Sequence, residues 1–223
     1  MVVALQPSLL DGPLDDADAQ RTVVRVHPLD SLVGPGKAPT RTELASGAWV
    51  DVLPGWVTGS DELFERLATR VPWHAERRHM YERDVDVPRL LAWYGEDDHL
   101  PDEALVSARR LLSEHYADEL GEPFVTAGLC LYRDGRDSVA WHGDTIGRSR
   151  HEDTMVAILS LGTPRALLLR PRGGGETRRY MLGHGDLLVM GGSCQRTWEH
   201  AVPKTARPVG PRISVQFRPR GVR

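Results

Sequence analysis

Residues 212–218 read Arg-Ile-Ser-Val-Gln-Phe-Arg, and this stretch indicates the class of fold. Three apolar residues alternate with four polar ones, so a strand here would place the apolar set on one face and the polar set on the other. The interior of a small barrel does not normally hold two arginines. Arg212 and Arg218 would suit a barrel that binds an anion, whereas in a half-exposed edge strand they would be solvated. Both interpretations are open from this segment alone.

Short apolar runs separated by turn residues fill the chain after Gly121. They are Phe124–Tyr132, Met155–Leu161, Ala166–Leu169, Leu187–Met190 and Ile213–Phe217. Many short strands at this spacing are typical of an antiparallel sandwich or barrel. Upstream, Ser60-Asp61-Glu62 and Pro101-Asp102-Glu103 are typical helix starts, and apolar residues at helical spacing follow each. We therefore expect a mainly β (α+β) fold, in which two helices pack against one sheet of a jelly-roll-like core.

The N-terminal stretch has a different composition. Residues 1–45 are rich in Asp, Pro and Gly and show little periodicity, which predicts a partly irregular extension with at most an edge strand at Val23–Val26. Residues 46–223 would form the folded domain. Within it we expect residues 46–122 to carry the helices and residues 123–223 the β core.

The charge is distributed unevenly along the chain. Up to Tyr132 there are 12 Lys and Arg against 23 Asp and Glu, and after it 16 against 8. This asymmetry predicts either an anionic partner for the C-terminal part or two halves that complement each other. No apolar run is long enough for a membrane span, and no secretory signal is visible. We expect a cytoplasmic monomer, with Cys130 and Cys194 as free thiols and no membrane association.

A possible metal site lies in the sequence Trp141-His142-Gly143-Asp144. In an extended chain, residues two apart project to the same face, so His142 and Asp144 can reach one ion. Two histidines and one carboxylate on one face of an octahedron are typical of non-haem Fe(II) oxygenases. His200 is the candidate for the distant second histidine. His184, in a second His-x-Asp sequence, is flanked by glycines and precedes an apolar run, which favours a structural role.

A series of motifs resembles one known family. In chain order these are Tyr132-Arg-Asp-Gly135, His142-Gly-Asp144, Ser160-Leu-Gly-Thr-Pro164, Leu182–Met190, His200 and Arg212–Arg218. The ordered set resembles the AlkB family of nucleic-acid dealkylases over roughly residues 70–223. The nearest likeness is to the subgroup with a Tyr-x-Asp-Gly-x-Asp loop before the metal histidine, here Tyr132–Asp137.

The resemblance implies a double-stranded β-helix that binds Fe(II), 2-oxoglutarate and O2 and oxidatively dealkylates bases of alkylated DNA or RNA. It also implies roles for particular residues. The implied metal ligands are His142, Asp144 and His200. The implied 2-oxoglutarate contacts are Arg212 and Tyr132 at the distal carboxylate, Arg218 near the metal-binding end, and Ser214 and Gln216 in the same cavity.

The resemblance also implies substrate contacts. A base must be flipped out or already single-stranded to reach a buried iron, and it then needs an aromatic stacking partner. Trp93 and Tyr94 lie in the segment that resembles the family's nucleotide-recognition lid, within residues 46–122, and Trp93 could equally be a core residue. Weaker candidates for the same lid are Trp73, Arg77 and Arg78. Candidate phosphate contacts are Arg148, Arg150, Arg170, Arg172, Arg178 and Arg179, for which a solvated surface position is the alternative.

Three positions depart from the family pattern. Cys130 and Ser214 stand where asparagine is usual, and Ile146 stands where an acid usually reaches the damaged base. Losing one hydrogen bond at Cys130 would weaken co-substrate binding by about 1 kcal/mol. Two alternatives therefore stay open: an Fe(II)/2-oxoglutarate hydroxylase of a small molecule, lipid or protein, and a catalytically weakened binding protein. DNA cannot be distinguished from RNA at this point.

Overall fold

The computed structural model describes residues 23–29, 38–80 and 83–222. The helices are α1 (Ser60–Arg70), α2 (Glu103–His115), α3 (Ala117–Leu120) and α4 (Cys194–Thr197), with single 3-10 turns η1 (Ala45–Gly47) and η2 (Arg148–Arg150). None of the helices in these ranges has the length and apolar character that a membrane span requires.

Most of the chain forms strands, which belong to three sheets. The largest sheet has the order β2-β3-β12-β9-β14-β7-β6-β5, and a four-stranded sheet has the order β11-β10-β13-β8. A small additional sheet pairs β1 with β4. The bounds are β1 (Arg25–Val26), β2 (Thr40–Glu43), β3 (Ala48–Leu53), β4 (Val57–Thr58), β5 (His74–Met80), β6 (Arg83–Tyr94), β7 (Thr126–Tyr132), β8 (Val139–His142), β9 (Val156–Gly162), β10 (Arg165–Pro171), β11 (Arg178–Leu182), β12 (Asp186–Gly192), β13 (Trp198–Val202) and β14 (Arg212–Arg218).

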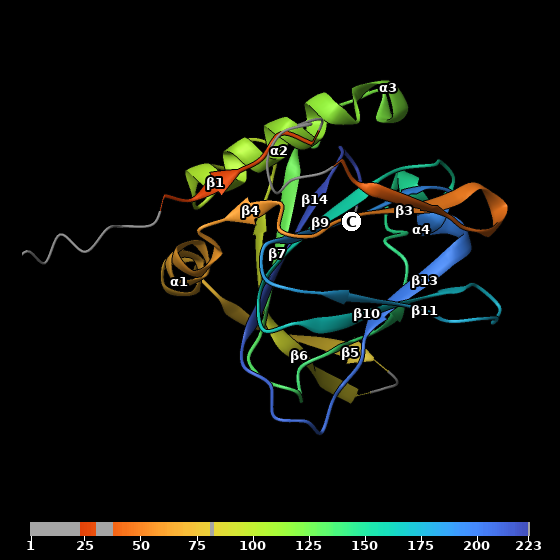
Figure 1. Cartoon of the computed structure of the whole chain (residues 1–223). Coiled ribbons are helices and arrows are strands. Elements are labelled where there is room, and N and C mark those ends of the chain that lie inside the picture. The colour runs from red at the N-terminus through yellow and green to blue at the C-terminus, as the bar shows by residue number, and fades with distance from the viewer. Residues whose placement is uncertain (1–22, 30–37, 81–82, 223) are drawn as a thin grey trace, which may run out of the picture.

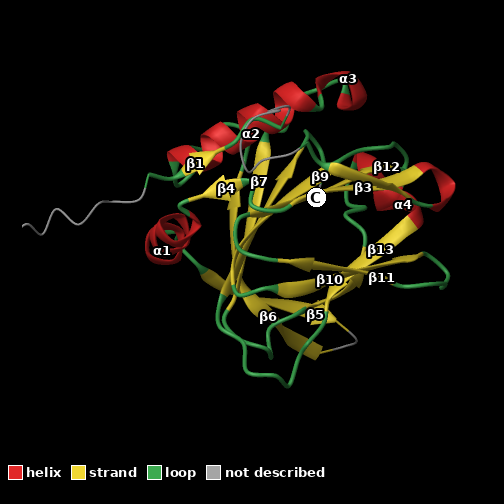
Figure 2. Cartoon of the chain, viewed as in Figure 1, coloured by secondary structure: helices red, strands yellow, loops and turns green. Residues whose placement is uncertain are grey.

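The eight-stranded sheet lies between two layers. Helices α1 and α2 lie on one side of it, and the four-stranded sheet lies on the other (Figures 1 and 2). Every strand pair within both sheets is antiparallel. This is the jelly-roll arrangement that the spacing of apolar runs predicts.

Two hydrophobic cores follow from this layering. The helix-side core contains Ile213, Val215 and Phe217, packed with Leu63 of α1 and Leu112 of α2. The second core lies between the sheets and includes residues of β9, β10, β12 and β13. Because successive residues of a strand point to opposite faces, the polar residues of β14 must face the space between the sheets. The arginines of β14 are therefore interior, and the solvated edge-strand alternative is wrong.

The helix and strand predictions hold over the C-terminal half. Each of the five predicted apolar runs corresponds to a strand, although the runs from Phe124 and Met155 begin two residues and one residue before β7 and β9. Helix α2 begins where predicted, with Asp102 accepting a hydrogen bond from the Ala104 N–H at 3.0 Å. The expectation that residues 46–122 hold mainly helices was incomplete, since β3, β5 and β6 also lie there. Strand β2 lies inside the expected N-terminal extension of residues 1–45. It pairs with β3, so part of this extension belongs to the eight-stranded sheet.

Candidate metal and co-substrate site

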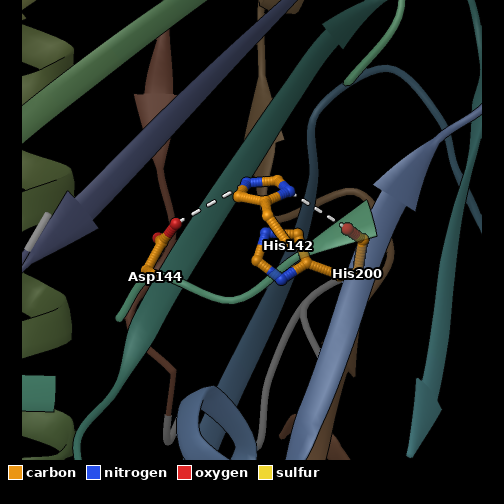
Figure 3. Close-up of side chains that lie close together, drawn as sticks. All are labelled: His142, Asp144 and His200. Atoms are coloured by element: carbon orange, nitrogen blue, oxygen red, sulfur yellow. Dashed lines mark hydrogen bonds and ion pairs between the residues drawn. The ribbon is translucent and has the colours of Figure 1, made fainter. Parts of the chain in front are cut away.

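The three predicted metal ligands converge between the two sheets. One ligand atom each from His142, Asp144 and His200 lies within 4.8 Å of the other two (Figure 3). The imidazole rings have centroids 4.2 Å apart, and His142 Nε2 lies 3.7 Å from Asp144 Oδ1. The donor set of two imidazoles and one carboxylate fits a 2-His-1-carboxylate iron site.

Strand pairing brings the two histidines together across 58 positions of sequence. His142 at the end of β8 stands directly opposite His200 in β13. The Nδ1 atom of His142 lies 2.8 Å from the carbonyl oxygen of Ala140 and 3.1 Å from that of His200. A carbonyl accepts only from N–H, so Nδ1 carries the proton and Nε2 is left free to bind a metal. Burial lowers the pKa of His200 to about 3, so its ring is neutral and able to coordinate.

Asp144 is held as a carboxylate by a buried cation. Its Oδ2 accepts a hydrogen bond from Arg218 Nε at 2.8 Å and forms an ion pair with Arg218 Nη2, also at 2.8 Å. Burial alone would raise the pKa of Asp144, but the Arg218 charge and the two histidines outweigh it and lower that pKa to about 2. The backbone N–H of Asp144 donates to Gln195 Oε1 at 3.0 Å. The sequence motifs did not point to Gln195, which no spacing rule links to the metal pair.

Gly143 separates the two adjacent ligands and has no room for a side chain. A Cβ atom there would lie 2.5 Å from Arg172 Nη2 and 2.6 Å from the carbonyl oxygen of Gln195. We predict that Gly143→Ala displaces the His142–Asp144 turn and weakens divalent-metal affinity about 10- to 100-fold, the usual cost of disturbing groups that orient ligands. Titration calorimetry with Mn(II) measures this, and an unchanged affinity would contradict the geometry.

Arg212 lies deep in the same space, at the end of β14. It is 1% exposed, and it stands opposite Tyr132 with its guanidinium carbon 5.3 Å from the tyrosine ring centroid. Its Nε donates to Ser160 Oγ at 3.0 Å, whereas its buried Nη1 has no hydrogen-bond partner among the residues described. Burial lowers the pKa of Arg212. A buried cation with a free donor fits a small carboxylate ligand, as the resemblance implies.

The remaining predicted co-substrate residues lie between Arg212 and Arg218. Ser214 is buried, and its Oγ accepts from Gln216 Nε2 at 2.6 Å. Cys130 lies opposite Ser214, with its Sγ 3.7 Å from Gln216 Oε1. The polar face of β14 is thus a continuous row from Arg212 to the metal carboxylate. Ser160 completes this wall; it belongs to a predicted motif, but the sequence assigned it no role.

Trp93 lies on the site face of β6, and Tyr94 does not. Trp93 stands opposite Gly128, and a Cβ at Gly128 would lie 3.4 Å from the Trp93 ring and 2.9 Å from Arg218 Nη1. The Trp93 side chain is 40% exposed, and the Arg218 guanidinium carbon lies 5.9 Å from its ring centroid. Tyr94 instead packs against the helix-side core. Neighbouring residues of a strand point to opposite faces, so Tyr94 faces away from the metal group, and its contact with substrate stays a prediction.

The two arginines predicted as substrate contacts differ in position. Arg172 lies beside Gly143, and its Nη2 donates to the Gln195 carbonyl at 3.4 Å. Arg148 forms ion pairs with Glu122 and Glu152. Phosphate contacts from either residue stay a prediction.

The other candidate substrate residues are more scattered. Arg170 pairs with Glu199 at 3.1 Å and Arg178 with Glu176 at 3.3 Å, while Arg150 and Arg179 are exposed. Trp73 packs against the helix-side core, which favours a structural role. Arg77 lies on β5, and the side chain of Arg78 is outside the described residues.

His184, the competing histidine, lies outside the metal group. Its Nδ1 accepts the Gly162 N–H at 2.6 Å, and its Nε2 lies 3.1 Å from Asp61 Oδ1. These contacts tie the β11–β12 turn to β9 and α1, in agreement with the predicted structural role.

Comparison with known sequences identifies the family. The sequence profile of the 2OG-Fe(II) oxygenase superfamily matches residues 50–218. The chain belongs to this superfamily. Members use Fe(II), 2-oxoglutarate and O2, and the His142–Asp144–His200 group supplies the donors that such an oxygenase requires.

Within the 2OG-Fe(II) oxygenase superfamily, the chain is similar to AlkB homologues. It is 32% identical over 190 residues to alpha-ketoglutarate-dependent dioxygenase alkB homolog 3 of Homo sapiens and to that of Bos taurus. Each match covers 76% of this chain and 65% of the relative, so the chain spans about two thirds of their length. DNA oxidative demethylase ALKBH2 of Homo sapiens is 25% identical over 178 residues, covering 71% of this chain and 68% of that protein.

Solved structures agree with this oxygenase fold. A 2OG-Fe(II) oxygenase family oxidoreductase from Burkholderia pseudomallei superposes with a TM-score of 0.55 at 14% identity, over 78% of this chain and 86% of that one. OsALKBH1 superposes with a TM-score of 0.53 at 16% identity, over 79% and 100%. At these identities the likeness supports the fold alone.

Proposed function

We propose that this oxygenase removes alkyl groups from N-alkylated nucleic-acid bases by oxidation, with Fe(II), 2-oxoglutarate and O2. The observation that carries the proposal is the convergence of His142, Asp144 and His200 between the two sheets, where β14 also places the unpaired donor of Arg212. The similarity to alkB homolog 3 and to the DNA demethylase ALKBH2 supports a nucleic-acid substrate.

Each protein group has a distinct task in this scheme. When bound, the iron with 2-oxoglutarate and O2 supplies the oxidant that hydroxylates the carbon attached to a base nitrogen. His142, Asp144 and His200 would hold the metal, for which two imidazoles and one carboxylate are suitable ligands. Arg218 keeps Asp144 ionised and oriented, and Arg212 binds the distal carboxylate of the co-substrate.

The aromatic partner for a flipped base is Trp93. Its ring lies on the site face next to Arg218, and its exposed part offers a surface on which a base can stack. Ile146 is 67% exposed just beyond the metal pair, where it offers an apolar contact instead of the carboxylate usual in the family. We therefore infer that base selection in this protein relies on stacking and shape more than on an acid at this position.

The function is tested with oligonucleotides that carry 1-methyladenine or 3-methylcytosine. We expect each to lose the mass of one methylene group, only when Fe(II) and 2-oxoglutarate are both present. His142→Ala should abolish the loss, whereas the matched variant His184→Ala should retain it. Succinate formation without any change in the oligonucleotides would instead favour an oxygenase with a different substrate.

Replacing Trp93 by alanine should weaken the binding of methylated oligonucleotides by about 1–3 kcal/mol, the usual contribution of one stacked base. The affinity for 2-oxoglutarate should stay unchanged, because Trp93 stands opposite Gly128, four positions along β7 from Tyr132, the residue opposite Arg212. Tyr94→Ala is the matched control for a lost aromatic residue on the other face; folded protein is verified by circular dichroism. Equal oligonucleotide affinity for wild type and Trp93→Ala, measured by fluorescence anisotropy, would contradict the stacking role.

A further inference from the structure

Cys130 places a thiol on the same sheet face as Arg212, between the two sheets. In the pairing of β7 with β14, Cys130 stands opposite Ser214, and Tyr132 stands opposite Arg212. Cys130 and Arg212 are therefore diagonal neighbours on the same face, about 7–8 Å apart at Cα, a separation that a long side chain spans. The thiol is half-buried and contacts Gln216 at 3.7 Å.

Arg212 is a second, independent indication that a ligand binds beside Cys130. Its side chain is buried, and its Nη1 lacks a hydrogen-bond partner within the described parts of the chain. A small carboxylate that pairs with this donor would be held beside the Cys130 sulfur. The thiolate is the nucleophilic form of cysteine.

We propose that Cys130 is a covalent modification site for α,β-unsaturated dicarboxylates, of which fumarate is the simplest. Arg212 binds one carboxylate, and this places the alkene carbons near the sulfur. The Cys130 sulfur forms a bond to one alkene carbon, the π electron pair moves to the other carbon, and that carbon takes up a proton. The thiol is consumed, no group leaves, and no external oxidant or reductant is needed.

The expected adduct is a thioether that carries two carboxylates beside Arg212. It would occupy the place of the co-substrate, so modification would inactivate the protein under the proposed function. The modification itself requires neither iron nor nucleic acid. It goes beyond the dealkylation proposal and can be tested even if that proposal fails.

The test is mass spectrometry of the metal-free protein after incubation with fumarate. We expect one added fumarate per chain, located on the peptide that contains Cys130 and absent from the Cys130→Ser variant. Cys194 is the internal control, since it is buried and burial raises its pKa to about 12. Excess succinate, a saturated dicarboxylate, should slow the reaction by competing for Arg212.

A separate variant tests whether Arg212 positions fumarate beside the Cys130 sulfur. Arg212→Gln should slow the fumarate reaction about ten-fold or more, the equivalent of losing one charge-assisted hydrogen bond, without slowing the reaction with neutral acrylamide. If that variant does not fold, the wild-type protein is compared with free glutathione. The rate of reaction with fumarate divided by that with acrylamide should be higher for Cys130 than for the glutathione thiol. An equal ratio, equal labelling of Cys194, or an unreactive Cys130 would overturn the proposal.

Discussion

Arg212→Gln should reduce the affinity of the metal-loaded protein for 2-oxoglutarate by roughly 2–5 kcal/mol, which is about 30- to 4,000-fold. The physical reason is that Arg212 is buried with one donor unpaired, whereas Arg165, a second cation at the Tyr132 ring, already donates to three backbone carbonyls. Glutamine keeps a polar side chain but loses the charge and the two-pronged geometry. Titration calorimetry with Mn(II) in place of Fe(II) measures the dissociation constant without turnover.

Arg220→Gln is the matched control for this prediction. Arg220 lies two positions beyond β14, is exposed, and pairs with Glu96 at the surface. Its replacement should leave the 2-oxoglutarate affinity unchanged within two-fold, because an exposed ion pair contributes little. A similar small effect for both variants would show that Arg212 does not bind the diacid.

Arg218→Met should lower the free energy of unfolding of the metal-free protein by about 3–5 kcal/mol, because it leaves the buried Asp144 carboxylate without its cation. A divalent metal bound by Asp144 would supply the missing positive charge. Mn(II) should therefore raise the melting temperature of Arg218→Met by more than it raises that of wild type. Thermal denaturation with and without Mn(II) measures both effects.

The control for the charge pair is the double variant Arg218→Met with Asp144→Asn. Removing both charges should recover part of the stability lost in Arg218→Met, since no unpaired carboxylate remains. The double variant should also lose the stabilisation by Mn(II). If Mn(II) stabilised the double variant as strongly as wild type, the metal would be bound elsewhere.

The alternation in residues 212–218 predicted the key strand correctly because its polar side chains share one face. That face is interior, and the decisive residues Arg212 and Arg218 are both buried in it. The metal pair at His142 and Asp144 was also predictable, since residues two apart in extended chain converge. The local sequence and the family resemblance favoured His200 over His184, but the pairing of β13 with β8 that brings His200 opposite His142 is not encoded locally.

The strands of the N-terminal half were harder to predict for physical reasons. The long strand β6 contains Pro88, and its hairpin partner β5 is rich in charged residues and histidine, so neither shows an apolar alternation. In β3, Asp51 interrupts an apolar run. This carboxylate can be buried because it accepts hydrogen bonds from Arg41 and Tyr116. Such strands are stabilised by their neighbours more than by intrinsic preference. The faces of Trp93 and Tyr94 likewise depended on register, which only the assembled sheet defines.

The most direct test of the central claim is the binding of Mn(II) and 2-oxoglutarate to wild type, His142→Ala and His184→Ala. We predict one Mn(II) per chain for wild type and His184→Ala, with 2-oxoglutarate binding that depends on the metal. His142→Ala should lose both. Unchanged Mn(II) and 2-oxoglutarate binding by His142→Ala, or loss of both in His184→Ala alone, would contradict a site built from His142, Asp144 and His200.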